Sequence, residues 1–265
     1  MKTEKRVAKN KLGLPPEYKK QPEYFDAFNI NDDTDAKNAV IEKLLKAQGV
    51  KSVLDITCGT GSQVFHLIEE GYEVTGSDFS PALLEIARDK ARKKKLDVSF
   101  IDGDMRNIKM GRFDGVISIF NAVGHLTKTG FGKAMRNIHG NLSDGGVYIF
   151  DILNLSAMTD KLVADFAYHI HAKAKDSQIH AVQCSTVDRE SGRLVSYNYD
   201  ITQLKAETPK MSQSKCELQI YTANELTEML GRNGFEVLSQ CGLDGSTFHA
   251  SKTVNILTVA KKIPR

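Results

Sequence analysis

Strand-like and helix-like segments alternate along the first half of the sequence, and this alternation limits the possible folds more than any other feature. Short apolar segments typical of strands occur at 52–57, 72–77, 98–101, 113–120 and 147–152. The stretches between them carry apolar residues at helical spacing. Parallel strands are joined by crossovers of this length, usually through a helix. The alternation therefore predicts an α/β fold with a doubly wound, mostly parallel sheet.

The pattern changes after residue 155. Apolar and polar residues alternate in 166–170, 195–201 and 216–220, and Ser191-Gly192 provides a turn. A period of two is typical of antiparallel strands with one polar face. We therefore expect an antiparallel β insertion after the fifth strand.

The chain of 265 residues has a net charge of +3, which is unevenly distributed. Residues 1–20 hold seven lysines and arginines against two glutamates, a net charge of +5, so the remaining 245 residues carry −2. A nucleic-acid-binding body is therefore disfavoured. No segment has the ~18 apolar residues of a membrane helix or the apolar core of a signal peptide. We expect a soluble, cytoplasmic protein with no membrane partner.

Cysteines and histidines do not form a recognisable metal-binding motif. The four cysteines are far apart and include no C-x-x-C pair, which is typical of reduced thiols. His169, His171 and His180 could gather on a hairpin, but no nearby cysteine or carboxylate completes a zinc ligand set. We expect no metal site.

The first strand ends in the loop Asp55-Ile-Thr-Cys-Gly-Thr-Gly61, directly before a helix. Glycines in such a loop allow a ligand to approach the backbone closely, although they could also serve only a tight turn. A ligand of nucleotide type can lie across the carboxyl ends of the strands. The dinucleotide fingerprint G-x-G-x-x-G needs a third glycine where Val64 stands, which argues against NAD or FAD.

The next two strands also end in polar loops. Asp78 could accept hydrogen bonds from a ribose diol, and Phe79 could pack on a base. Asp78 could instead cap the following helix, a role for which Ser80 is better placed. Asp104 could accept from an exocyclic amine, and the Met105 amide could donate to a ring nitrogen. Three such loops in succession predict a single nucleoside-type ligand.

The segment 53–154 resembles the cofactor domain of class I S-adenosylmethionine-dependent methyltransferases. The resemblance rests on L-D-I-T-C-G-T-G (54–61), G-S-D-F-S-P-A-L-L (76–84), G-D-M-R (103–106), F-D-G-V-I-S-I-F (113–120) and Gly145-Gly146. It implies S-adenosylmethionine as the cofactor, with Tyr24 in an N-terminal segment that folds over it. Thr57 departs from the pattern, because it stands where the first glycine of the motif is often found. The implied cofactor-binding residues are Tyr24, Asp55, Thr57, Cys58, Gly59, Gly61, Asp78, Phe79, Ser80, Asp104, Met105 and Phe120.

The loop after the fourth strand, Asn121–Leu126, indicates the chemistry. It lacks the N-P-P-Y sequence of the methyltransferases that act on adenine or glutamine amides. It is similar instead to the N-x-x-x-H-L stretch of glycine N-methyltransferase and of related small-amine and amino-sugar N-methyltransferases. In that group an antiparallel insertion helps to cover the substrate. The catalytic candidates are His125 and Asn121. His125 could accept the proton of an amine or only brace the loop, and Asn121 could bind substrate or only cap its own turn.

The resulting hypothesis is methyl transfer by direct displacement to a small-molecule acceptor, at an amine nitrogen. The alternatives are an RNA or protein methyltransferase that uses the basic tail, and a cofactor-binding module without chemistry. A homodimer formed through the insertion is a further expectation.

The predicted fold class is α/β, with a Rossmann-like, doubly wound, seven-stranded and mostly parallel sheet and an antiparallel β insertion. The expected parts are a basic tail and lid segment (1–36), a cofactor core (37–155), the insertion covering the substrate site (156–221), and a C-terminal helix with the last two strands (222–265).

Overall fold

The computed structural model describes residues 18–263, except residues 175 and 206. The basic tail predicted at the N-terminus lies, up to residue 17, outside the described residues. In the described ranges, no helix combines the length and the apolar character needed to cross a bilayer.

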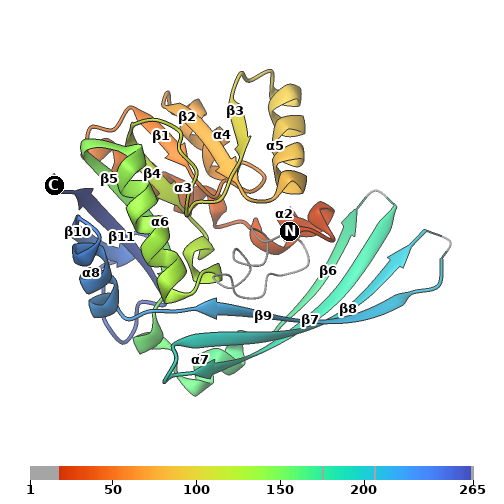
Figure 1. Cartoon of the computed structure of the whole chain (residues 1–265). Coiled ribbons are helices and arrows are strands. Elements are labelled where there is room, and N and C mark those ends of the chain that lie inside the picture. The colour runs from red at the N-terminus through yellow and green to blue at the C-terminus, as the bar shows by residue number, and fades with distance from the viewer. Residues whose placement is uncertain (1–17, 175, 206, 264–265) are drawn as a thin grey trace, which may run out of the picture.

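The main sheet has seven strands in the order β10-β11-β5-β4-β1-β2-β3 (Figure 1). The five strands β1 to β5 run parallel, and β11 runs antiparallel to both of its neighbours, β5 and β10. This arrangement confirms the predicted seven-stranded, mostly parallel sheet. The strands are β1 (Ser52–Asp55), β2 (Glu73–Asp78), β3 (Ser99–Asp102), β4 (Phe113–Ser118), β5 (Leu142–Leu153), β10 (Phe235–Gly242) and β11 (Asn255–Lys262).

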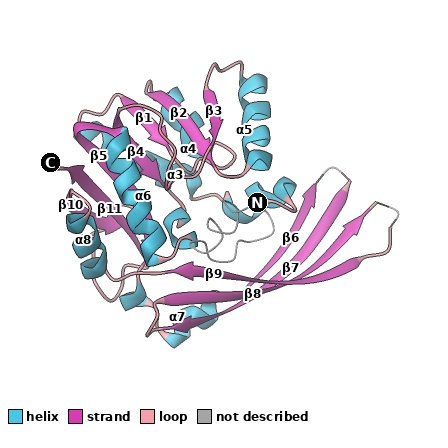
Figure 2. Ribbon diagram, viewed as in Figure 1, coloured by secondary structure: helices cyan, strands magenta, loops and turns pink. Residues whose placement is uncertain are grey.

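Helices flank the sheet (Figure 2), and side-chain caps begin two of them. Ser80 Oγ accepts a hydrogen bond from the Leu83 amide, and Pro81 holds the first helical position. Thr222 and Glu225 form the reciprocal capping box. The helices are η2 (Pro22–Tyr24), α2 (Phe25–Asn29), α3 (Thr34–Ala47), α4 (Ser62–Glu69), α5 (Pro81–Lys94), η3 (Ala122–His125), α6 (Lys128–Asn141), η4 (Leu155–Ala157), α7 (Asp160–Asp165) and α8 (Ala223–Arg232).

Strand β5 divides the core into two layers because successive side chains point to opposite faces of the sheet. Tyr148, Phe150 and Ile152 pack in the cluster that contains apolar residues of α6 and α8. Val147 and Ile149 pack in the opposite cluster, with apolar residues of α3 and α4. All five are at most 2% exposed, and burying such a side chain contributes roughly 1.5–3 kcal/mol.

Strand β4 ends two residues before the predicted end at 120. Phe120 and Asn121 have positive φ values of 63° and 57°, a left-handed conformation that few non-glycine residues adopt and that is incompatible with a strand. The chain therefore turns sharply at this point and places η3 over the carboxyl end of the sheet.

The insertion forms a separate four-stranded antiparallel sheet in the order β6-β7-β8-β9, which extends away from the core (Figure 1). This confirms the predicted antiparallel insertion after the fifth strand. His171 and His180 are cross-strand partners whose rings stack 4.1 Å apart. The strands are β6 (Tyr168–Ala174), β7 (Ser177–Asp188), β8 (Arg193–Leu204) and β9 (Lys210–Gln219).

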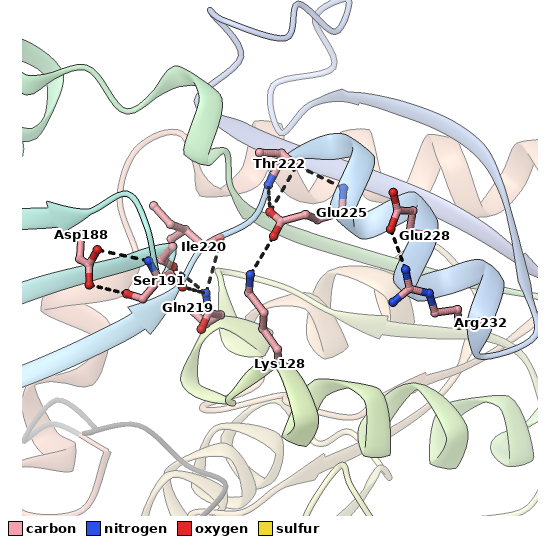
Figure 3. Close-up of polar contacts among 10 residues, drawn as sticks. Lys128, Asp188, Ser191, Gln219, Ile220, Thr222, Glu225, Glu228 and Arg232 are labelled. Carbon is pink, nitrogen blue, oxygen red and sulfur yellow. Dashed lines mark hydrogen bonds and ion pairs between the residues drawn. The ribbon is translucent and has the colours of Figure 1, made fainter.

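Two sets of polar contacts flank the point where β9 returns to α8 (Figure 3). The Gln219 side-chain amide lies 2.8 Å from the Ser191 carbonyl and 2.7 Å from the Gly192 carbonyl, so it holds the β7–β8 turn. The Lys128 ammonium at the start of α6 lies 2.7 Å from the Glu225 carboxylate in the capping box. The first contacts hold the β7–β8 turn to the end of β9, and the second holds α6 to the start of α8.

Candidate active site

A cavity opens at the carboxyl ends of β1, β2 and β3 and continues to the loop after β4. Parallel sheets commonly bind ligands at this edge. The cavity collects residues from each of the loops that the sequence singled out. The predicted residues that line it are Thr57, Cys58, Gly59, Asp78, Phe79, Asp104, Met105, Phe120 and His125.

The glycine loop after β1 adopts a backbone shape that glycine favours. Gly59 and Gly61 have φ values of +53° and +93°. A Cβ at Gly59 would lie 3.2 Å from the Phe25 ring, and a Cβ at Gly61 would lie 2.7 Å from the Phe65 ring. Gly61 does not line the cavity, since it is the N-cap of α4 and shapes the loop from behind. Gly59 lines the cavity, and the Phe25 ring lies against it.

Asp55, at the end of β1, lies behind the cavity wall. Its Oδ1 accepts a hydrogen bond from the Thr57 amide at 3.2 Å, and its buried Oδ2 has no partner among the described residues. Burial, helped by the nearby charge of Asp78, raises the pKa of Asp55 to about 8. Burial also raises the pKa of the adjacent Cys58 thiol, which makes it a neutral wall residue rather than a nucleophile.

Asp78 is a buried carboxylate at the cavity, fixed on both sides by backbone amides. Its Oδ2 accepts from the Gly59 amide at 3.0 Å, and its Oδ1 accepts from the Ser80 amide at 2.8 Å. These bonds tie the ends of β1 and β2 together and orient the carboxylate. Ser80 itself does not line the cavity, because it caps α5.

The loop after β3 brings Asp104 and Met105 to the cavity. The Arg106 guanidinium forms a two-point ion pair with Asp104, with nitrogen–oxygen distances of 2.9 and 2.5 Å. Met105 is buried, and its carbonyl accepts from the Asn137 side chain of α6 at 3.1 Å. The carboxylate and the Met105 backbone are therefore held in fixed positions.

The N-terminal segment 18–29 closes the cavity. The sequence suggested Tyr24 for this role, but the residues of the segment that line the cavity are others. Tyr18 and Phe25 line the cavity, with Tyr18 stacked on Phe79 at 6.0 Å between ring centroids. The segment is held to the core through Asp26, whose carboxylate lies 2.6 Å from both Thr60 Oγ1 and Lys90 Nζ. We call residues 18–29 the lid segment.

Tyr24 does not line the cavity. Its ring is 1% exposed and packs with Ala172 and Ile179 of the insertion. Its hydroxyl donates to Ser177 Oγ at 2.5 Å. Tyr24 therefore attaches the lid segment to β6 and β7, whereas Tyr18 and Phe25 face the cavity.

A second cavity, of about 440 Å³, lies between the core, the lid segment and the insertion. It shares four lining residues with the first cavity: Tyr18, Asn29, Phe120 and His125. His125 is buried, and its Nε2 lies 3.2 Å from the Tyr18 hydroxyl. Asn121 lines only the second cavity. The two cavities therefore meet at the loop after β4.

A hydrogen-bonded network that sequence reasoning missed supports this loop. The Asp151 carboxylate of β5 is fully buried and accepts from the Asn121 amide at 3.2 and 3.3 Å. The Asn255 side chain donates to Asp151 Oδ2 at 3.2 Å and to Asn121 Oδ1 at 3.3 Å. Burial raises the pKa of Asp151 to about 6. The network holds the left-handed conformation of Phe120 and Asn121.

Comparison with known proteins identifies what this architecture resembles. Residues 53–146 match the family model described as "Methyltransferase domain". The chain is 29% identical over 171 residues to a glycine/sarcosine N-methyltransferase of Parasynechococcus marenigrum, covering 57% of this chain and 59% of the relative. It is 32% identical over 133 residues to a dTDP-3-amino-3,4,6-trideoxy-alpha-D-glucopyranose N,N-dimethyltransferase of Streptomyces venezuelae, covering 48% of this chain and 54% of the relative. The aligned part thus spans little more than half the length of these relatives.

The fold is also similar to that of solved structures. A crystal structure of an S-adenosylmethionine-dependent methyltransferase from Clostridium acetobutylicum superimposes with a TM-score of 0.74 at 17% sequence identity. The match covers 91% of this chain and 96% of the other, so the likeness includes the insertion as well as the main sheet.

Proposed function

We propose that this chain, whose residues 53–146 are a methyltransferase domain of the S-adenosylmethionine-dependent class, transfers the cofactor's methyl group to an amine nitrogen of a small molecule. The observation that carries the proposal is the meeting of two cavities at Tyr18, Asn29, Phe120 and His125. One cavity would hold the cofactor and the other the acceptor. A direct displacement needs this arrangement, because donor and acceptor must approach in line.

The first cavity has groups that suit each part of the cofactor. Asp78 offers a fixed, buried carboxylate for a ribose diol, and Asp104 with the Met105 backbone suits an adenine edge. Gly59 lines the cavity, where the methionine portion would lie against the main chain. The Asp55 carboxyl behind this loop has an Oδ2 without a partner among the described residues, and positive charge on a cofactor bound nearby would favour its ionised form.

Bound in this cavity, S-adenosylmethionine supplies a methyl group that its positively charged sulfur has already activated. The protein then needs little acid or base chemistry, and its residues mainly orient the reactants and exclude water. Tyr18, Phe25 and Phe120 would provide apolar walls around the reacting atoms. We propose that His125 braces the lid segment through its contact with the Tyr18 hydroxyl, and that Asn121 fixes the loop through Asp151.

The kind of acceptor is inferred from the relatives and from the loop Asn121–Leu126. The names of the two relatives refer to glycine, sarcosine and an amino sugar nucleotide, all of which carry a nitrogen as the methyl acceptor. An amine acceptor for this chain is consistent with both. We further propose that residues 156–221 cover the acceptor, since β7, β8 and β9 contribute lining residues to the second cavity.

We also propose that two copies of the chain associate through the insertion. Tyr197, Tyr199 and Ile201 alternate along β8 and are 37%, 49% and 42% exposed. A row of exposed apolar side chains on one face of a sheet is typical of an interaction surface. The molecular mass in solution measures this association.

Isothermal titration calorimetry with S-adenosylmethionine tests the cofactor site. We expect the wild type to bind and Asp78→Ala to bind at least tenfold more weakly, because a charge-assisted hydrogen bond is worth about 1.5–3 kcal/mol. Asp102→Ala is the matched control, since Asp102 is an exposed strand-end carboxylate that does not line the cavity. Absence of binding by the wild type, or equal affinities for wild type and Asp78→Ala, would refute the proposed site.

A further inference from the structure

The charge and size of the second cavity narrow the class of acceptor. This inference rests on the proposed function, because it takes the second cavity as the acceptor site. The cavity's volume of about 440 Å³ lies within the range of small-molecule sites, so it has room for a body larger than glycine.

The lining of the second cavity is mostly apolar and aromatic. Four aromatic rings face it, from Tyr18, Phe28, Phe120 and Phe166. Leucines of β5, β8 and β9 complete the apolar wall. Aromatic faces attract cations as well as apolar groups, at about 0.5–2 kcal/mol per contact. The lining therefore suits an amine that carries an apolar or aromatic body.

Among the lining residues in the described part of the chain, the only carboxylate is Asp165 and there is no lysine or arginine. Asp165 is the last residue of α7, and Lys161 one turn earlier pairs with it at 2.8 Å. The Asp165 side chain is 58% exposed, so a bound ammonium can compete for it from the mouth of the cavity. A carboxylate or a diphosphate on the acceptor would find no lysine or arginine in this lining to pair with.

The insertion adds two polar side chains that carry no charge to this lining. Gln183 of β7 and Ser196 of β8 line the cavity, and both are within hydrogen-bond distance of Ser185 Oγ. Such groups can bind hydroxyl or ether oxygens of a neutral body, but they do not balance a negative charge.

We propose that the acceptor is an amine with an apolar or aromatic body and without a carboxylate or phosphate group. The amine enters as an ammonium ion and loses one proton to water. Its nitrogen lone pair then forms a bond to the methyl carbon while the carbon–sulfur bond breaks and its electron pair stays on sulfur. The products are an N-methylammonium ion and S-adenosylhomocysteine. The aromatic wall suits this product, because methylation enlarges the cation and makes it less hydrated.

The test compares amines with their α-carboxylated counterparts: 2-phenylethylamine with phenylalanine, tyramine with tyrosine, and histamine with histidine. S-adenosylhomocysteine release is measured for each, with glycine and a nucleotide-linked amino sugar alongside. We expect at least one amine to exceed its carboxylated counterpart tenfold in kcat/KM. A carboxylated or phosphorylated amine as the best acceptor, or no amine above background, would overturn the inference.

Two substitutions in the wall of the second cavity test which residues bind the amine. Asp165→Asn should raise KM for the reacting amine two- to fivefold, and Phe166→Leu three- to tenfold, with S-adenosylmethionine affinity unchanged in both. Asp160→Asn is the control, because Asp160 lies on the same helix, pairs with Arg189 and does not line the cavity. Unchanged KM in both wall variants would contradict the assignment.

Calorimetry with S-adenosylmethionine on the same samples distinguishes a failure of the proposed acceptor class from a failure of the proposed methyltransferase function. Release of S-adenosylhomocysteine with only anionic amines refutes the acceptor class and leaves the methyltransferase proposal intact. A wild type that neither binds the cofactor nor releases product with any compound refutes the proposed function itself.

Discussion

Replacing Asp151 by asparagine should change how stability depends on pH. Asp151 is fully buried in β5, and burial raises its pKa from 3.8 to about 6. The folded protein therefore binds a proton that the unfolded chain releases between these values. The contribution of this carboxyl group to the free energy of unfolding is fully present below about pH 4 and is lost as the pH rises through about 6. Since one pKa unit corresponds to ~1.4 kcal/mol, the loss is roughly 3 kcal/mol.

Asparagine has no charge to bury and can still accept from the Asn121 amide through its side-chain oxygen. The free energy of unfolding of Asp151→Asn, relative to wild type, should therefore rise by about 3 kcal/mol between pH 4 and pH 8. Urea unfolding of both proteins at the two pH values, without cofactor, measures this difference. Asp102→Asn is the control, since its carboxylate is exposed. Parallel pH dependence of wild type and Asp151→Asn would refute the reasoning.

Two further predictions concern the glycine loop and the loop after β4. Gly61→Ala should lower the free energy of unfolding by about 1–3 kcal/mol more than Gly71→Ala does. Both glycines have a positive φ, but only a Cβ at Gly61 would collide with the Phe65 ring. Equal losses of stability in urea unfolding would contradict this prediction. His125→Asn should lower kcat several-fold without changing the shape of its pH profile, since His125 braces Tyr18. Disappearance of a limb near pH 6–7 would instead make His125 the proton acceptor.

Local interactions explain why much of the fold was predictable. The caps at Ser80 and Thr222 depend on residues within three positions, and they appear as the sequence indicates. The order of strands and glycine loops places Asp78 and Asp104 at one cavity, because carboxyl ends of parallel strands share an edge. The left-handed turn at Phe120 was missed, since neither residue at that turn is a glycine.

Contacts between distant segments explain what the sequence did not reveal. Several aromatic residues stand close together near the N-terminus, and only the path of the chain decides that Tyr18 faces the cavity while Tyr24 faces the insertion. The role of Asp151 depends on Asn255, 104 positions away. A signal for Asp151 did exist, because a carboxylate inside an apolar strand is rarely buried without a structural or functional reason.

The lid segment has a consequence for the order of events in a catalytic cycle. It contacts the core through Asp26 and the insertion through Tyr24, and Tyr18 lies at the boundary of both cavities. Under the proposed function, the spent cofactor and the methylated product would both lie behind the lid segment. We expect their departure to require the contacts of Asp26 and Tyr24 to break, so that product release and cofactor exchange would depend on the same segment. The strength of these contacts would then influence the residence time of S-adenosylhomocysteine.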